Sequence, residues 1–154
     1  MWFRYIGLPC MLYLIRPNYA YISKHMSSQP DYFRYRSIHR RNFKKTKNYI
    51  DCVEDHHIIP KQWRNHELLQ SIEFDINSGK NLYIMPNNLA KNRFHLHPNT
   101  LIHQGGHSKY NIYVKEQLDY IHERNKDSQK YEFWLLLNHL KANMKFNEDN
   151  IPWK

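Results

Sequence analysis

The chain has 154 residues, of which 41% are hydrophobic and 15% aromatic, so it can bury one small core and is expected to form a single domain with extensions. Its formal net charge is +9, and the excess lies in residues 1–50, where ten Lys and Arg residues stand against one acid, Asp31. The two cysteines, Cys10 and Cys52, are distant and unpatterned, so neither a disulfide framework nor a Cys-rich zinc site is indicated.

Residues 1–16 are mostly apolar, but the uncharged run between Arg4 and Arg16 is about half as long as a membrane span requires. We therefore expect no transmembrane helix here. Since no small-residue cleavage site follows, the favoured interpretation is a peripheral hydrophobic extension of an intracellular protein, cytoplasmic or nuclear, or within the host cell if the protein is viral. Secretion is the alternative, with the apolar segment acting as a signal.

Residues 17–50 have no clean helical or strand period and combine basic with aromatic residues. Such a mixture can pair with phosphates and stack on bases, which favours a basic N-terminal arm that binds nucleic acid. Two simpler interpretations are a solvated linker and aromatic side chains that pack the arm onto the domain. The basic residues are Arg34, Arg36, Arg40, Arg41, Lys44, Lys45 and Lys47, and the aromatic residues are Tyr32, Phe33, Tyr35, Phe43 and Tyr49.

The middle of the chain predicts short elements separated by turn-forming residues. In chain order, the expected elements are a strand over residues 49–59 that ends at Pro60, a helix over 65–73, a turn at 77–80, a strand over 81–85 and an irregular, Asn-rich loop over 87–100.

Beyond residue 107 the pattern becomes helical. Apolar residues recur every three or four positions from Tyr110 to Ile121 and again from Phe133 to Met144, which indicates two amphipathic helices. Strands followed by helices predict an α+β fold. The expected division is an N-terminal arm (1–50), a core domain (51–124) and a C-terminal helix with its tail (125–154).

The run Asp55-His56-His57-Ile58-Ile59-Pro60 places two adjacent histidines on the first expected strand. Successive side chains of a strand point to opposite faces, so one imidazole can hold a metal while the other acts beside it as a base. A second pair, His103 and His107, lies at the entrance to a helix, and Asn81 begins the second strand. Two strands and a helix that converge on one divalent ion form a ββα-metal (His-Me finger) core, here with a two-helix C-terminal extension.

Phosphodiester hydrolysis needs an activated water and stabilisation of negative charge at the phosphate. We assign His56, His103 and His107 as ligands of one divalent metal ion. His57 is assigned as the general base, because an unliganded imidazole accepts a proton near neutral pH. Asn81 is expected to orient this base or to brace the loop that carries the ligands. Three imidazoles suit Zn²⁺, Ni²⁺ or Mn²⁺ better than Mg²⁺, which prefers oxygen.

Two details of the ligand set follow from the sequence. Gly105 and Gly106 weaken a helix by roughly 1 kcal/mol each, so the helix is expected to begin near His107, with His103 in the preceding loop. His95 and His97 share one face of an extended segment and form an alternative ligand pair.

Four segments occur in the order and spacing of a known family: His56-His57-Ile58-Ile59-Pro60, Phe74-Asp75-Ile76-Asn77, Asn81 through Pro86, and Leu101-Ile102-His103-Gln104-Gly105-Gly106-His107-Ser108-Lys109-Tyr110. Over residues 55–118 the chain thus resembles the AHH nucleases of the HNH/endonuclease VII superfamily. The resemblance implies a metal-dependent endonuclease in which the first histidine of the pair is a ligand and the second is the base, and it favours DNA over RNA.

The chain departs from this family at Asp55, where a small residue is usual. Its carboxylate is expected to orient an imidazole, to compete for the ion or to face solvent. A milder departure is the strand sequence Asn-Leu-Tyr-Ile-Met-Pro, which keeps the family's Asn and Pro.

The favoured function is therefore a metal-dependent endonuclease that acts on nucleic acid, with double-stranded DNA as the expected partner. The alternative is a nucleic-acid-binding module with a structural zinc site and no catalysis, which predicts a filled tetrahedral shell. A third hypothesis, a secreted or membrane-associated nuclease toxin, shares the chemistry and needs the apolar N-terminus as a targeting element.

Overall fold

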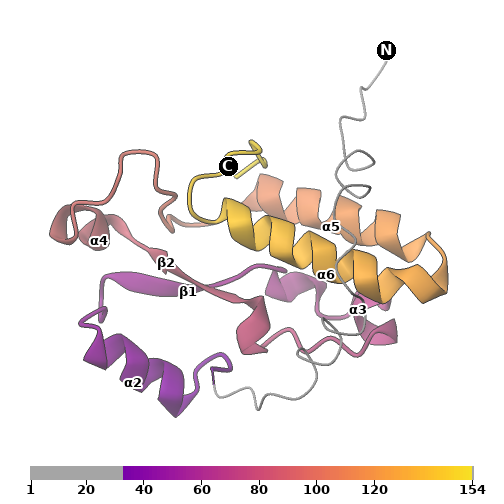
Figure 1. Cartoon of the computed structure of the whole chain (residues 1–154), viewed down its shortest axis with the longest axis horizontal. Coiled ribbons are helices and arrows are strands. Elements are labelled where there is room, and N and C mark those ends of the chain that lie inside the picture. The colour runs from indigo at the N-terminus through magenta and orange to yellow at the C-terminus, as the bar shows by residue number, and fades with distance from the viewer. Residues whose placement is uncertain (1–32, 154) are drawn as a thin grey trace. The chain divides into compact units, whose positions relative to one another are not determined.

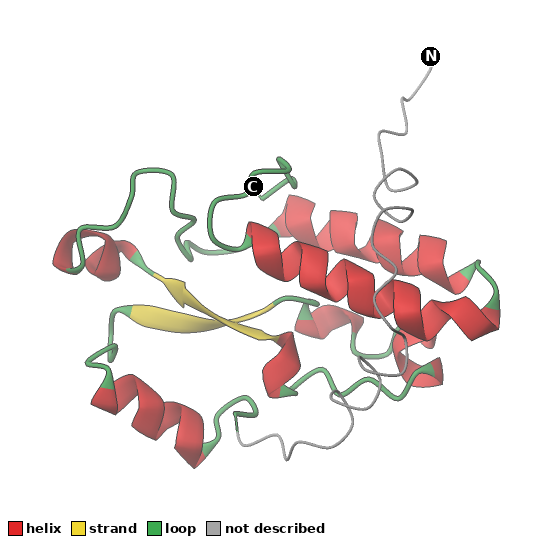
Figure 2. Ribbon diagram, viewed as in Figure 1, coloured by secondary structure: helices red, strands yellow, loops and turns green. Residues whose placement is uncertain are grey.

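The structure is a computed structural model, and it describes residues 33–153. Predictions for residues 1–32, including the apolar extension and Tyr32, lie outside the described residues. Within the described range, a two-stranded antiparallel hairpin is combined with helices (Figures 1 and 2), which confirms the predicted α+β class. The elements are α2 (Ile38–Thr46), β1 (Val53–His57), α3 (Glu67–Ser71), β2 (Leu82–Pro86), α4 (Asn88–Arg93), α5 (Ser108–His122) and α6 (Lys126–Asn143), with short 3₁₀ helices at η1 (Lys61–Trp63) and η2 (Gly79–Asn81).

The hairpin pairs β1 with β2 so that Asp55 lies opposite Ile84 and His56 opposite Tyr83. Both strands differ in their bounds from the prediction. The first is shorter because Asp51 adopts a left-handed φ of 63°, which is incompatible with extended pairing just before β1. The second begins at Leu82, since Asn81 belongs to η2.

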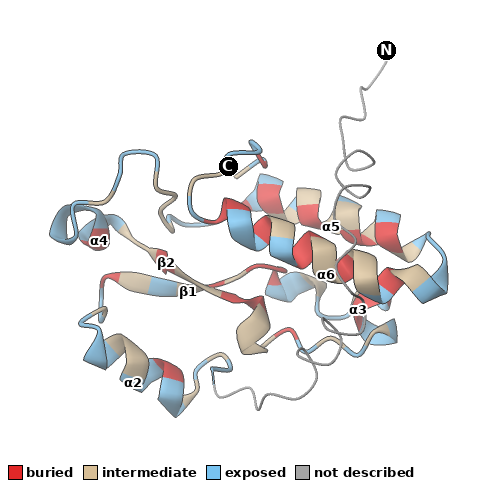
Figure 3. Ribbon diagram, viewed as in Figure 1, coloured by how far each residue is buried: buried red, intermediate tan, exposed pale blue. Residues whose placement is uncertain are grey.

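The core lies where the residues after β1 meet α3, α5 and α6. The apolar stripes predicted for the last two helices are confirmed, and Figure 3 shows buried residues recurring along α5 and α6. The predicted helix over 65–73 is present but shorter, because Glu73 takes a left-handed φ of 54° just beyond its end. The fully buried side chains include Ile58, Ile59, Leu68, Tyr110, Val114, Leu118, Phe133 and Leu140.

Two expected irregular segments contain helices instead. The loop over 87–100 includes α4, because Asn87 caps it: its Oδ1 accepts hydrogen bonds from the backbone N–H groups of Leu89 and Ala90. The segment 17–50 includes α2, whose N-cap Ser37 accepts from the N–H of Arg40 at 3.2 Å. Both helices were missed because their start signals are caps rather than an apolar period.

The segment before α2 is tied to the rest of the domain by aromatic and backbone contacts. The N–H of Tyr35 donates to the carbonyl of Asn77 at 2.9 Å. The ring of Tyr35 contacts that of His57 in β1, and beyond α2 the ring of Tyr49 contacts that of Phe94 edge-on. From residue 33 onward, the structure thus favours the interpretation in which aromatic side chains pack this segment onto the domain. Among residues 33–153, no helix is long and apolar enough to cross a membrane.

Candidate metal centre

Three histidines from separate parts of the chain converge beside the hairpin. His56 comes from β1, His103 from the segment between α4 and α5, and His107 from the residue that precedes α5. One ligand nitrogen from each lies within 4.8 Å of the other two, and no other group of this kind occurs in residues 33–153. The structure therefore brings together all three residues assigned as metal ligands.

The backbone around the second pair explains how both histidines reach the site. The N–H of His103 donates to the carbonyl of Pro86 at 2.8 Å, which fixes this residue to the end of β2. Gly105 has a left-handed φ of 64°, a conformation that glycine adopts without steric cost. The chain then enters α5 directly after His107, whose carbonyl accepts from the N–H of Asn111. The prediction that the helix begins near His107 is confirmed.

The environment of His56 keeps its imidazole neutral. Burial, followed by the neighbouring His107, His103 and His57, lowers the pKa of His56 from 6.5 to about 3. Its Nε2 is buried and has no hydrogen-bond partner among the described residues. A neutral imidazole with an unsatisfied nitrogen is the form that binds a metal, so this residue fits the ligand role.

Glu54 adds a carboxylate that sequence analysis missed. Its Oε2 lies 2.9 Å from Nδ1 of His103. Metal-ligating histidines commonly donate their other ring N–H to a carboxylate, which fixes the tautomer and leaves Nε2 to bind the ion. Glu54 is two residues before His56 and so shares its face of β1. The two-residue spacing between Glu54 and His56 was the sequence signal that could have placed this carboxylate at the site.

Trp153 forms an apolar wall of the cluster. Its ring centroid lies 4.2 Å from that of His107 and 5.2 Å from that of His56, and it also contacts Tyr110. No sequence motif connects this residue to the histidines, because it is brought here by the path of the chain after α6.

His57 lies outside the three-histidine cluster, on the other face of β1. Its Nε2 is 3.4 Å from Oδ1 of Asn77, and its ring contacts that of Tyr35 at 4.7 Å. Burial lowers the pKa of His57, while the Asn77 hydrogen bond opposes this shift. The ring is therefore held neutral and oriented. The sequence placed Asn77 in a turn and at the end of the family segment Phe74–Asn77 but gave it no role, so its contact with His57 is a new feature of the site.

Asn81 braces the chain that follows β1. It is fully buried, and its Oδ1 accepts from the N–H of Ile59 at 2.7 Å. Its Nδ2 donates to the carbonyls of Ile59 at 3.0 Å and Ile76 at 2.8 Å. These contacts brace the chain after β1 against Ile76, and not the segment that carries His103 and His107, so the role expected for this amide stays a prediction.

Asp55 does not belong to the histidine cluster, forms its ion pairs with cations rather than with an imidazole, and does not face solvent. Its Oδ1 lies 2.6 Å from Nε of Arg40 and 2.9 Å from Nζ of Lys44, and only 12% of its side chain is exposed. None of the three interactions predicted for this carboxylate is the one observed. The reason is α2, which the sequence did not reveal and which places two cations against β1.

The alternative ligand pair is not assembled in the described structure. His95 is exposed and has a left-handed φ of 47°. His97 is also exposed, and its ring contacts that of Phe146. Neither belongs to a group of potential metal ligands.

Comparison with models of protein families matches residues 34–143 to a family described as "AHH: A nuclease family of the HNH/ENDO VII superfamily with conserved AHH". The match covers more than two thirds of the chain and includes α2 as well as the three histidines. Searches of curated proteins and of solved structures returned no match.

Proposed function

We propose that this chain, which belongs to the AHH nuclease family of the HNH/endonuclease VII superfamily, is a metal-dependent endonuclease that hydrolyses phosphodiester bonds of double-stranded DNA. The observation that carries the proposal is the convergence of His56, His103 and His107 within 4.8 Å. A family of nucleases supplies the reaction class, and the cluster supplies a place for the divalent ion.

The three histidines would hold one divalent ion. The buried, partnerless Nε2 of His56 and the contact between Glu54 and His103 both fit this role. An all-imidazole donor set favours Zn²⁺, Ni²⁺ or Mn²⁺ over Mg²⁺. When bound, the ion supplies charge stabilisation at the phosphate oxygens. Three protein ligands are typical of catalytic rather than structural sites, because they leave coordination positions for substrate.

His57 is the proposed general base. Its lowered pKa keeps the ring in the unprotonated form that accepts a proton from water. With Nε2 directed at Oδ1 of Asn77, the other ring nitrogen, Nδ1, is assigned as the proton acceptor. Asn81 acts indirectly in this proposal. Its three hydrogen bonds, to Ile59 and Ile76, hold the backbone that follows His57.

The test uses metal-stripped protein, single divalent ions added back, and plasmid DNA or structured RNA as substrate. His57→Ala should retain metal affinity in calorimetry but cut about 10²- to 10⁴-fold more slowly, the range expected for loss of a general base. His107→Ala should weaken both metal binding and cutting. His97→Ala is the matched control, because it removes an exposed histidine outside the cluster.

Two outcomes would contradict the proposal. If His57→Ala cuts as fast as wild type, the assignment of the base is wrong. If the protein binds metal and DNA but no ion supports cutting of either substrate, the site is structural and the chain is a nucleic-acid-binding module.

A further inference from the structure

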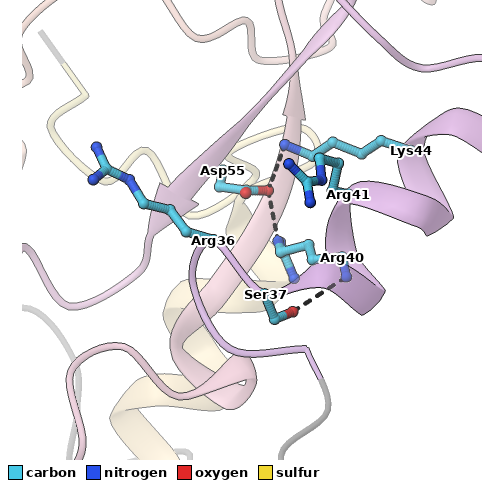
Figure 4. Close-up of a pocket in the computed structure, with 6 residues that line it drawn as sticks. All are labelled: Arg36, Ser37, Arg40, Arg41, Lys44 and Asp55. Atoms are coloured by element: carbon cyan, nitrogen blue, oxygen red, sulfur yellow. Dashed lines mark hydrogen bonds and ion pairs between the residues drawn. The ribbon is translucent and has the colours of Figure 1, made fainter.

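A second site lies on the other face of β1, between this strand and α2. It is a pocket of about 290 Å³. Figure 4 shows Asp55 of β1 directed toward Arg40 and Lys44 of α2. The lining residues are Arg36, Ser37, Arg40, Arg41, Lys44 and Asp55.

The lining carries a strong excess of positive charge. Four of its residues are cationic and one is a carboxylate, which leaves a formal excess of three positive charges. Asp55 uses a single oxygen, Oδ1, to bind both Arg40 and Lys44, so one negative charge holds two of the four cations in place. Arg41 is exposed and adds a guanidinium to the same pocket. A pocket of this composition favours an anionic ligand.

Arg40 gives an independent indication of a ligand. Only 5% of its side chain is exposed, its Nε binds Asp55, and its Nη1 reaches the carbonyl of Phe33 at 3.5 Å. Its Nη2 is buried and has no hydrogen-bond acceptor within the described part of the chain. Buried donors are nearly always paired, because an unpaired one loses its bonds to water. An anionic oxygen in the pocket would supply the missing acceptor.

The pocket adjoins the proposed catalytic base. Asp55 and His57 are two residues apart on one face of β1, a separation of about 6.6 Å along a strand. Tyr35 also connects His57 to the pocket, because its ring contacts that of His57 at 4.7 Å and lies 5.2 Å from the guanidinium carbon of Arg36, which lines the pocket. An anion in the pocket would therefore lie close to the proposed base.

We infer that this pocket binds a backbone phosphate of the nucleic acid next to the phosphate that is hydrolysed. The inference rests on the proposed function for the identity of the polymer. Arginine suits this task, because its planar guanidinium makes paired hydrogen bonds to phosphate oxygens. Asp55, at the position where the family has alanine in its conserved AHH, acts here by positioning Arg40 and Lys44. A phosphate contact of this kind fixes the register of the duplex without reading its sequence.

The experiment compares two double variants of the full chain that lose the same charge from the same region. Arg36→Gln with Arg41→Gln removes two pocket cations. Lys45→Gln with Lys47→Gln removes two exposed cations outside the pocket. Binding of a short fluorescent DNA duplex is measured by anisotropy in metal-free buffer, where no cutting occurs, at several salt concentrations. Thermal melting checks that each variant is folded.

The pocket variant should bind the duplex more weakly than the lysine variant. The magnitude of its slope of log K against log salt should also be smaller than that of the lysine variant by about 1, which corresponds to the loss of one phosphate contact. Equal affinities and slopes for the two variants would overturn the inference, as would a wild type that does not bind the duplex. If the pocket variant melts at a lower temperature, Arg41→Gln against Lys45→Gln makes the same comparison with one exposed residue each.

Cutting is measured separately with metal present, so that the two proposals can fail independently. A wild type that binds DNA through the pocket but cuts with no ion would contradict the proposed function and leave the pocket intact. A wild type that cuts, with both variants binding alike, would contradict the pocket alone.

Discussion

The two faces of β1 differ in how their polar groups are satisfied. On one face, Glu54 and His56 lie with His103 and His107, and a buried nitrogen of His56 has no partner among the described residues. On the other face, Asp55 is bound by two cations, and His57 is held by Asn77 and Tyr35. Adjacent residues of one strand thus face a cluster of candidate metal ligands on one side and a charge-paired interface on the other.

The difference shows how the five residues of β1 can combine two tasks, metal binding on one face and positioning of α2 on the other. The metal face keeps the neutral imidazole of His56 unsatisfied at Nε2, which costs stability but prepares this group for an ion. The α2 face uses its carboxylate to hold a helix in place. The strand's alternation separates these tasks, so each face can be altered without directly removing a contact from the other.

The largest expected effect comes from the α2 face. Asp55→Ala leaves Arg40 buried without its counter-ion, and breaking such a buried pair costs about 3–5 kcal/mol of unfolding free energy. Urea denaturation measures the loss, and calorimetry should show unchanged metal affinity for the folded protein. Arg34→Gln is the control, because it breaks the exposed pair with Asp75 and should cost about 1 kcal/mol or less. Equal losses in the two variants would refute the distinction between buried and exposed pairs.

The second effect concerns the metal face. A divalent ion at a hundred times its Kd should stabilise wild type by about 2.7 kcal/mol, because it binds only the folded protein. His56→Ala should lose this stabilisation at the same ion concentration, while Arg34→Gln keeps it. Thermal melting with and without the ion makes the measurement. A His56→Ala protein with the full metal-induced shift would show that this histidine is not a ligand.

A third, smaller effect is expected at Glu54. Glu54→Gln removes the charge that orients His103, and loss of such an outer carboxylate typically weakens metal affinity about 10- to 100-fold. Isothermal titration calorimetry gives the affinity. Glu123→Gln, at the exposed far end of α5, is the matched control. If both variants bind metal like wild type, the contact between Glu54 and His103 has no role in the site.

The smallest effect is predicted for Asn77, whose side chain contacts His57, the proposed base. Asn77→Ala removes a long hydrogen bond of 3.4 Å to His57, so cutting should slow by no more than about tenfold, which corresponds to roughly 1.4 kcal/mol. Asn77→Asp retains an acceptor oxygen and should recover part of the rate. The rate at saturating DNA should fall while KM stays constant. A change in KM alone would indicate a role in substrate binding instead.

The periodicity of apolar residues was enough to predict the helices that have an apolar stripe. The helices α5 and α6 have continuous apolar stripes, and the histidine spacing indicated which residues meet. The helices α2 and α4 have no such stripe. The first is specified by a Ser37 cap and by docking through Arg40, and the second by an Asn87 cap. Capping residues are short-range signals that turns share, which is why both segments were interpreted as irregular.

The sequence by itself determined the α+β class, the membership in a nuclease family and the set of histidines that converge. Only the tertiary structure decided what surrounds them: Glu54 behind His103, Trp153 beside His107, and Asp55 paired with Arg40 rather than with an imidazole. The physical reason is that alternation along a strand assigns a side chain to a face, whereas its partner there depends on which distant segment packs against that face.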